Sequence, residues 1–487
     1  MEQLGTMLLA PGDNLKKVLE VINESGRGVA LVVDGNRRLL GLVTDGDIRR
    51  GLISGLNLET SVSETMVTNP VTAAAGTSTD EILSLMNMYI RHIPVVDENR
   101  RLCDLVCFSD HTKRIPWAVP YIGSEEAEEV ADSFRSNWLT MGPKVKRLEQ
   151  DVADYLGVKH AVAVSNGTAA LDVALKVLGI GPGDEVIIPA FTYIATANAV
   201  LYQHATPVLA DIEPKTFNMD PEDVARKITP RTRCIMPIDY GGQSSDYQAL
   251  MEIADKHGIP LVEDGAESLG AKYRGRKLCT FGELGTTSFH AAKVITTVEG
   301  GMVITDYDEH ARVARIIRNQ GEDPANKYHH PYLGHNYRMT DLHAAIGLAQ
   351  FKRLDEVLRK RAEISDYYTS NLQEFQDVVT LPYVDPENKP AWFFYPILAE
   401  NRDQIITYLA GKGVDVRVAW PLPIHKQPLY QRLLGEVYYP VAEEVAAHVL
   451  NLPIYYGMTD EEMLYVMVHL KDAISMAMDG GLELAKQ

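Results

Sequence analysis

The first hundred residues contain a segment that is repeated once. VVDGNRRLLGLVTDGDI matches the later VVDENRRLCDLVCFSDH, so that Asp34 aligns with Asp97 and Asp47 with Asp110 at the same spacing. A regular repeat constrains the fold, because two copies of one small supersecondary unit must bury their apolar faces together. We therefore expect two similar units, over residues 1–62 and 63–114.

Each copy predicts an apolar strand, a turn at Asp-Gly-Asn or Asp-Glu-Asn, a second strand and a polar step into a helix. Thr44 and Asp47 follow the strand LLGLVT, where they can cap that helix. The pattern resembles the paired CBS domain, a regulatory module that often binds adenine nucleotides through a Gly-x-Val-Thr-x-x-Asp segment. The resemblance implies an adenine nucleotide at Thr44 and Asp47, with Asp110 at the matching place. A helix cap without a ligand is the alternative.

The second copy departs from the nucleotide-binding pattern at two of its three positions. Asp104 and Cys107 stand where the first copy has Gly41 and Thr44. A ribose hydroxyl would lose a hydrogen-bond partner there. The first copy is therefore the better candidate for a nucleotide site.

Length and charge limit what the rest of the chain can be. The 487 residues exceed what one hydrophobic core usually supports, and 46% hydrophobic with 23% charged residues is typical of a folded protein. The net charge of −19 argues against a protein that wraps nucleic acid. No segment approaches about 18 consecutive apolar residues, so we expect no membrane span. Four cysteines without CxxC spacing favour a cytoplasmic location: Cys103, Cys107, Cys234 and Cys279.

The order of predicted elements changes twice along the chain. After a linker marked by Pro116 and Pro120, helical patterns such as YQALMEIADKHG alternate with apolar strands such as IPLVED. This alternation predicts an α/β domain over residues 115–372, with a mostly parallel sheet between helices. Residues 373–487 then predict a small α+β domain with the strand WFFYPIL, the helix QIITYLAGKG, the strand DVRVAW and a final helix.

The segment SFHAAKVITTVEGG contains the lysine on which the functional prediction depends. Lys293 follows the strand PLVED, whose last residue, Asp264, is expected at the carboxyl edge of the sheet, where such sheets bind ligands. A lysine can react with an aldehyde, and a carboxylate can keep a pyridine nitrogen protonated. Together they predict a site for pyridoxal 5'-phosphate.

Two further segments supply what that cofactor needs. SNGTAALDVALKVLG predicts a turn into a helix whose first N–H groups, at Gly167, Thr168 and Ala169, can bind phosphate, and Ser288 adds a hydroxyl. An aromatic ring can stack on the cofactor. Phe191 and Tyr193 lie on one side if their segment is extended.

Residues 115–487 resemble the DegT-type sugar aminotransferases, which are fold type I pyridoxal phosphate enzymes. The resemblance runs in order through NWLTMGPKVKRLE, SNGTAAL, FTYIATANA, VEDGAESLGA, SFHAAKVITTVEGG, GHNYRMTDLHAAIGLAQ and WPLPIHKQPLY. It implies that Lys293 binds the cofactor covalently, Asp264 pairs with the ring nitrogen, Tyr193 stacks on the ring, and Thr168, Ala169 and Ser288 bind the phosphate. It also implies an active homodimer, since Asn336, and less directly Arg338, would reach the neighbouring subunit's cofactor.

The resemblance extends to the substrates and leaves one residue open. The family acts mainly on nucleotide-linked keto-sugars with glutamate or glutamine as donor, and Glu-Gly-Gly after Lys293 is more typical of amination at C4 than at C3. Glu267 stands where the family often has Gln or His. It either donates as a neutral acid or contacts substrate. His290, Arg417 and His425 lie in segments expected near the substrate, and a core or surface role is the alternative for each.

Several other readings compete with this one. Related sugar dehydratases replace the lysine by histidine, so Lys293 disfavours that chemistry. A nucleotide-sensing protein with an idle larger domain is a second alternative, but it would not need the cofactor residues. The pair His329-His330 is better explained by a surface loop than by a metal site. GIGPGD follows a predicted helix rather than a strand, which argues against a dinucleotide site.

Overall fold

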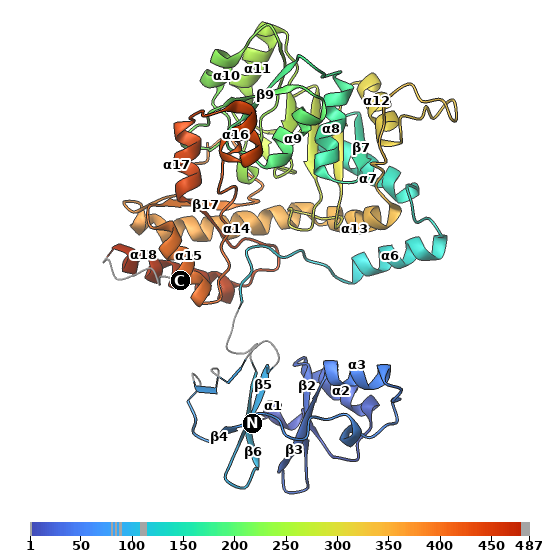
Figure 1. Ribbon diagram of the computed structural model, residues 1–487, viewed down its shortest axis with the longest axis vertical. Helices are drawn as coiled ribbons and strands as arrows, with labels where there is room; N and C mark the ends of the chain where they lie inside the picture. The colour runs from blue at the N-terminus through green and yellow to red at the C-terminus, as the bar shows by residue number, and fades with distance from the viewer. Residues whose placement is uncertain (1, 79–80, 83–84, 87–89, 108–113, 479–487) are drawn as a thin grey trace. The chain divides into compact units, whose positions relative to one another are not determined.

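The computed structural model describes residues 2–78, 81–82, 85–86, 90–107 and 114–478 (Figure 1). The chain divides into two compact units, Met1–Arg114 and Ile115–Gln487. Asp110, expected at the second nucleotide position, lies outside the described residues. Within the described part of the chain, no helix combines the length and the apolarity needed to cross a bilayer.

The first unit contains two three-stranded sheets with the same topology. In each sheet the first strand is parallel and the third antiparallel to the middle one, in the orders β1-β2-β3 and β4-β5-β6. One hydrophobic core takes residues from both copies. The elements of this unit are α1 Glu2–Gly5, β1 Leu8–Leu9, α2 Leu15–Ser25, β2 Val29–Val33, β3 Leu39–Thr44, α3 Asp45–Ile53, the 3-10 turn Val62–Glu64, β4 Ala73–Ala74, β5 His92–Val96 and β6 Leu102–Cys107.

The turns of the two copies repeat one another in detail. Asp34 Oδ1 accepts two backbone N–H groups at 2.8 and 2.9 Å, and Asp97 Oδ1 accepts the equivalent two at 2.9 and 2.7 Å. Each turn places an arginine in the left-handed region, Arg37 with φ 59° and Arg100 with φ 58°. The predicted repeat is thus present in backbone geometry as well as in sequence.

The second unit is built around a mostly parallel sheet. A three-stranded part, β10-β8-β9, and a four-stranded part, β11-β14-β15-β7, are joined by parallel bridges from Ile235 to Leu261 and from Ile238 to Asp264. β15 alone among these strands runs antiparallel to its neighbours. The strands are β7 His160–Val164, β8 Glu185–Pro189, β9 Thr206–Ala210, β10 Thr232–Ile235, β11 Val262–Asp264, β14 Leu284–Ser288 and β15 Gly301–Thr305.

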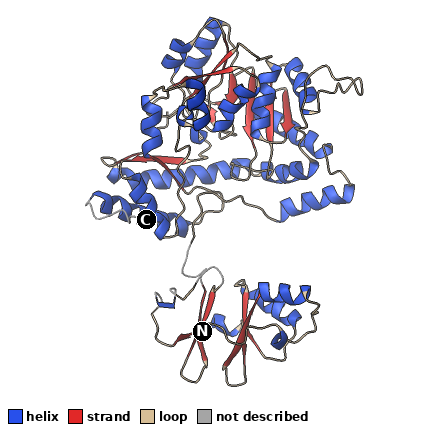
Figure 2. Cartoon of the chain, in the orientation of Figure 1, coloured by secondary structure: helices blue, strands red, loops and turns tan. Residues whose placement is uncertain are grey.

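Helices surround these strands (Figure 2), which confirms the predicted α/β class. α11, Tyr247–His257, shows how the sequence specifies one of these helices. Tyr247, Leu250 and Ala254 form its buried face. Asp246 caps its start, and Gly258 ends it with a φ of 63°. The remaining elements up to residue 318 are α6 Ser124–Ser136, α7 Pro143–Leu156, α8 Gly167–Val177, α9 Ile194–Tyr202, α10 Pro221–Lys227, the 3-10 turn Tyr240–Gly242, the hairpin β12 Lys272–Tyr273 with β13 Arg276–Lys277, and α12 Asp308–Arg318.

The C-terminal part forms an antiparallel sheet, β16-β17-β18, with helices packed on it. Its hydrophobic core also takes Ile115 and residues of α14, so it begins before residue 373. The elements are α13 Asp341–Lys352, α14 Leu354–Leu372, the 3-10 turn Gln373–Phe375, β16 Val379–Thr380, β17 Tyr395–Ala399, α15 Arg402–Gly411, the 3-10 turn Ile424–Lys426, α16 Pro428–Leu434, α17 Pro440–His448, β18 Val449–Leu452 and α18 Asp460–Met478.

One predicted strand is wrong. DVRVAW forms no strand, because Val414, the residue before it, pairs with Ile115 while Arg417 pairs with Asn451, so no continuous ladder develops on one partner. Trp420 then adopts a φ of 49°, which turns the chain away from an extended path.

Candidate active site

Most of the residues predicted for the cofactor line one cavity of about 610 Å³ in the larger unit. It opens at the carboxyl end of β11 and the N-terminus of α8, where open α/β sheets bind ligands. Its volume is that of a typical small-molecule site. The predicted residues that line it are Gly167, Thr168, Tyr193, Asp264, Glu267, Ser288, His290, Lys293 and Arg417.

Lys293 enters the cavity from the loop between β14 and β15. Its Nζ lies 3.4 Å from Glu267 Oε1 and 4.1 Å from the centre of the Phe393 ring. Glu267 is held on its other oxygen by the Gly241 N–H at 2.8 Å. Burial raises the pKa of Glu267, and the charge of Lys293 and the Gly241 N–H oppose that rise. Lys293 therefore lies beside the buried side chain of Glu267. The role of Glu267 toward cofactor or substrate stays a prediction.

Asp264 ends β11 and is 2% exposed. Its Oδ2 accepts the Thr196 hydroxyl at 2.7 Å, and its Oδ1 accepts the Ala266 N–H at 3.3 Å. Burial raises its pKa, whereas Thr196, Ala266 and the positive charge of Lys293 lower it. Asp264 is thus a buried carboxylate whose ionised form is supported by hydrogen bonds and one nearby cation.

The first turn of α8 and the end of β14 form the predicted phosphate end of the cavity. Gly167 and Thr168 are the first residues of the helix, so their N–H groups have no acceptor within it. A Cβ at Gly167 would lie 2.8 Å from Ser288 Cβ, and one at Gly301 would collide with the backbone oxygen of Asn166. Glycine at these positions lets the serine hydroxyl approach the helix N-terminus.

Ala169 differs from this expectation. Its N–H already donates to Asn166 Oδ1 at 2.8 Å, the side chain that caps α8. An anion at the helix terminus would meet the free amides of Gly167 and Thr168 first. The Ala169 amide becomes available only if Asn166 turns away.

Phe191 and Tyr193 do not share a side, contrary to the expectation for an extended segment. Phe191 is fully buried against Tyr240 and Trp420, whereas Tyr193 is 57% exposed at the cavity. The segment bends before α9 and Tyr193 caps that helix, so the two-residue alternation of a strand does not apply. Tyr193 remains available to cover a ligand.

Besides Ala169, three predicted residues do not line the cavity of their own chain: Asn336, Arg338 and His425. Asn336 is exposed and bridges to Asn319, and Arg338 Nη1 donates to Asn319 Oδ1 at 2.8 Å. His425 is 1% exposed and contacts Glu443 Oε1 at 2.9 Å. His425 is therefore a core histidine here, since the segment WPLPIHKQPLY turns inward after Leu422.

The cavity also contains residues that the sequence did not single out. Thr192 and Asn166 stand in segments already recognised, so their neighbours could have indicated them. Trp117 and Phe393 come from distant parts of the chain and carry no local signal. Trp117 lies under Arg417, whose guanidinium carbon is 5.5 Å from its ring centre.

The residues fit pyridoxal 5'-phosphate. One cavity is lined by a lysine, a buried carboxylate and a phosphate cradle. A Cβ at Gly167 would fill that cradle. The three correspond to the aldehyde, the ring nitrogen and the phosphate of that molecule. When bound, the cofactor supplies an aldehyde for amines and a ring that withdraws electrons from the reacting carbon.

In the first unit, Thr44 and Asp47 hydrogen-bond to one another. The Thr44 hydroxyl donates to Asp47 Oδ2 at 2.7 Å, and the two form a capping box at the start of α3. Asp47 Oδ1 accepts Arg50 Nη2 at 2.6 Å. The predicted helix cap is present.

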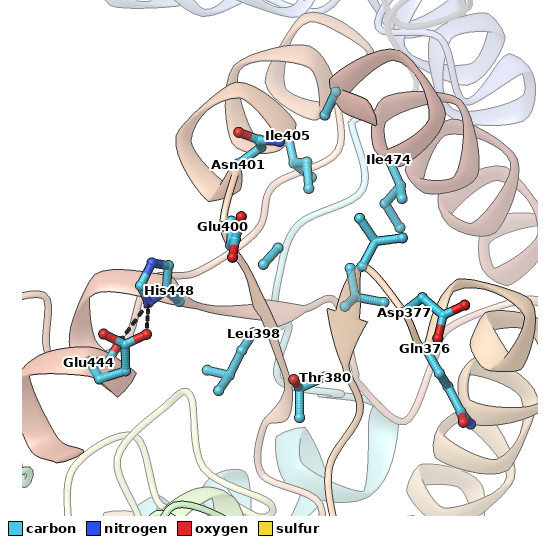
Figure 3. Close-up of a pocket in the computed structure, with 14 residues that line it drawn as sticks. Gln376, Asp377, Thr380, Leu398, Glu400, Asn401, Ile405, Glu444, His448 and Ile474 are labelled. Atoms are coloured by element: carbon cyan, nitrogen blue, oxygen red, sulfur yellow. Dashed lines mark hydrogen bonds and ion pairs between the residues drawn. The ribbon is translucent and has the colours of Figure 1, made fainter. Parts of the chain in front are cut away.

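A second cavity, of about 320 Å³, lies in the C-terminal part (Figure 3). Asp377, Glu400 and Glu444 face it, and Glu444 Oε1 pairs with His448 Nδ1 at 3.1 Å. These carboxylates would repel a phosphate-bearing ligand, and the cavity shares no lining residue with the lysine site. The chemistry is therefore expected at Lys293.

Comparison with known proteins agrees with this site. Residues 120–471 match the DegT/DnrJ/EryC1/StrS aminotransferase family, and residues 7–54 and 62–110 match the CBS domain. GDP-perosamine synthase of Caulobacter vibrioides is 41% identical over 367 residues, which is 74% of this chain and 98% of that protein. The UDP-2-acetamido-2-deoxy-3-oxo-D-glucuronate aminotransferase of Pseudomonas aeruginosa is 37% identical over 66% of this chain and 88% of its own.

Solved structures place the larger unit in the same group. DesV from S. venezuelae is 34% identical with a TM-score of 0.70, covering 74% of this chain and 99% of its own. NtdA from Bacillus subtilis, solved with bound cofactor PMP, is 31% identical with a TM-score of 0.69 over 75% of this chain and 87% of its own. The expected fold type I architecture is confirmed. The chain therefore belongs to the DegT/DnrJ/EryC1/StrS aminotransferase family and is a pyridoxal-phosphate-dependent enzyme that carries an N-terminal pair of CBS domains.

Proposed function

We propose that this enzyme transfers an amino group from glutamate or glutamine to the keto group of a nucleotide-linked sugar, at C4. The observation that carries the proposal is the convergence of Lys293, Asp264 and the N-terminus of α8 on one cavity. Relatives named for GDP-linked and UDP-linked sugars support the substrate class. The Glu299-Gly300-Gly301 sequence favours C4, while the relative named for a 3-oxo sugar represents the alternative position.

In this proposal each residue acts on a specific atom. Lys293 Nζ binds the cofactor. As a free base it would then move a proton between the substrate carbon and the cofactor carbon that are bonded to the transferred nitrogen. Asp264 favours a proton on the ring nitrogen, Tyr193 covers the ring, and Gly167, Thr168 and Ser288 bind the phosphate. Glu267 faces Lys293 Nζ at 3.4 Å and holds it in an ion pair before the cofactor is bound.

The substrates are anionic, as is the protein, with a net charge of −19. Attraction must therefore come from local cations. Among the described residues that line the cavity, the cationic side chains are Arg417 and Lys293. His290 also lines it and lies near the carboxylate of Glu299. We assign Arg417 to the diphosphate of the sugar nucleotide or to the side-chain carboxylate of the donor. His290 is proposed as a contact to the sugar.

We further infer an active homodimer. Asn336 is exposed and does not line the cavity of its own chain, although the Ser165 N–H, at the start of the phosphate segment, donates to the Tyr337 carbonyl at 2.8 Å. A second copy could thus receive Asn336, with Arg338 beside it. If so, mixing inactive N336A and K293A proteins should restore activity that neither has alone. Mixtures that exchange subunits and stay inactive would contradict a shared site.

The CBS pair is proposed as a regulatory or assembly module that binds an adenine nucleotide at Thr44 and Asp47. The intact Thr44 and Asp47 support the first copy as the binding side. The test is a titration with AMP, ADP and ATP that follows both turnover and oligomeric state. If neither changes at saturating nucleotide, regulation by the module is excluded.

The function as a whole is tested by incubating the purified holoenzyme with glutamate and a panel of keto-sugar nucleotides. The panel varies the position of the keto group and the nucleotide carrier, and release of 2-oxoglutarate is measured. We expect turnover with 4-keto substrates and none with K293A. Turnover confined to 3-keto sugars would overturn the assignment to C4, and elimination of water from the sugar would indicate a dehydratase.

A further inference from the structure

Two threonine hydroxyls connect the cavity wall to Asp264. Thr192 Oγ1 and Thr196 Oγ1 are 2.7 Å apart, and Thr196 Oγ1 lies 2.7 Å from Asp264 Oδ2. Thr192 is 2% exposed and lines the cavity, while Thr196 is fully buried. Thr196 lies in the first turn of α9, and Thr192 is the residue before Tyr193, the N-cap of that helix.

The direction of these hydrogen bonds follows from the charge on Asp264. An ionised carboxylate only accepts, so Thr196 must donate its single hydroxyl proton to Asp264. The Thr196 oxygen is then left as an acceptor, which requires Thr192 to donate to it. Both hydroxyl protons point toward Asp264 and stabilise its negative charge. The positive N-terminal end of α9 stabilises the same charge. Protonation of Asp264 would reverse the order.

The chain of hydroxyls matters most when Lys293 is uncharged. Burial raises the pKa of Asp264, and the groups that lower it are the Thr196 hydroxyl, the Ala266 N–H and the charge on Lys293. The lysine carries no charge while it acts as a free base. Thr196 then remains as the side chain that supports the carboxylate.

We propose that Thr196 is a positioning residue that keeps Asp264 ionised and correctly oriented for the cofactor's ring nitrogen, and that Thr192 acts on Asp264 through Thr196. This inference rests on the function proposed above, in which Asp264 pairs with that nitrogen. It adds a hydrogen-bonded relay that reaches from a buried carboxylate to the cavity surface.

The experiment uses the holoenzyme loaded with pyridoxal phosphate labelled with ¹⁵N in the ring. The ¹⁵N resonance reports whether the ring nitrogen is protonated, and it is followed against pH in the wild type, T196V and T196S. Valine keeps the shape of threonine without the hydroxyl, and serine restores it. We expect the pH at which the nitrogen loses its proton to fall by about one unit or more in T196V, because a hydrogen bond to a charged group is lost. T196S should follow the wild type.

Thr305 provides the matched control. It is 3% exposed, and its hydroxyl donates to the Glu283 carbonyl at 2.7 Å, so T305V removes a buried hydroxyl without touching Asp264. A T196V titration identical to the wild type, or an equal shift in T305V, overturns the relay. If T196V does not retain cofactor, T192V decides: a smaller shift in the same direction supports the relay, and no shift refutes it. A wild-type nitrogen that is unprotonated at neutral pH would instead refute the role of Asp264 itself.

Discussion

Lys293 and Glu267 form an ion pair inside the cavity, with Nζ 3.4 Å from Oε1 and the lysine 18% exposed. Burial raises the pKa of Glu267, and the positive charge of Lys293 opposes that rise. The lysine amine has to leave this ion pair before it can attack an aldehyde.

Replacing Glu267 by Gln should let the apoprotein load cofactor faster at a fixed pH. The amide keeps an acceptor for the Gly241 N–H, which the wild type bonds at 2.8 Å, but removes the ion pair that holds Lys293 Nζ. We expect the loading rate to rise by about tenfold, because the amine no longer has to leave a charged partner. The measurement is the rise of the visible absorbance of lysine-bound cofactor after mixing. Equal rates in E267Q and the wild type would show that the ion pair has no influence on loading.

The K293A variant should lose both covalent attachment and turnover. No other lysine lines the described part of the cavity, so the nucleophile and the proton carrier disappear together. Turnover should fall at least about 10³-fold, the scale expected for a general base. Absorbance spectra and rates should be compared with K256A, which changes an exposed lysine of α11. A visible band that survives in K293A would place the covalent link elsewhere.

The sequence predicted those parts of the site that depend on short segments. Asp264 at the end of a strand and Gly167 at the start of a helix follow from hydrophobic pattern and turn chemistry, and both line the cavity. Contacts between distant segments were not predictable. Gly241 reaches Glu267, and Phe393 reaches Lys293, only because the sheet and the C-terminal part fold against each other.

The two errors have different origins. Phe191 and Tyr193 separate because the chain bends at residues 190–192, just before α9, so the two-residue alternation of a strand does not apply. His425 was expected near substrate, but Glu443 of α17 draws it into the core. Its segment carries proline at three places, which restricts the backbone without indicating the direction of the turns.

Removal of the Arg417 guanidinium should weaken substrate binding more than catalysis. Arg417 lies over Trp117 at the cavity, where it can face an anion. For R417M we expect KM for the affected substrate to rise at least about tenfold with little change in kcat, since binding in ground and transition states falls together. Separate KM values for donor and sugar nucleotide identify which anion is bound. R432M, at an exposed arginine of α16, is the control. Unchanged KM for both substrates would remove Arg417 from the site.

Stability should fall as pH rises toward neutrality because of Asp239. This carboxyl is buried, accepts the Ser245 N–H at 3.0 Å, and has its pKa raised by burial to about 7. In the unfolded chain the pKa of Asp239 is about 3.9, so between about pH 3.9 and 7 the native state binds more protons than the unfolded state. The free energy of unfolding therefore decreases as pH rises through this range and levels off above about pH 7. The loss is on the order of 4 kcal/mol at most. The measurement is the free energy of unfolding of the apoprotein by denaturant, followed against pH. D239N should lack this decrease, while E222Q, at an exposed glutamate, should keep it. A slope that persists in D239N would assign it to other groups.

Loss of the Thr44 hydroxyl should destabilise the CBS pair and separate two roles of that residue. Thr44 caps α3 and donates to Asp47 at 2.7 Å, so T44A should lower the stability of this unit by about 1 kcal/mol. S54A, which removes a hydroxyl at the other end of α3, is the matched control. Calorimetric titration with adenine nucleotides then tests whether Thr44 only caps the helix or also binds a nucleotide. If Thr44 also binds a nucleotide, affinity should fall in T44A and not in S54A; if both variants bind as the wild type does, Thr44 is a helix cap only.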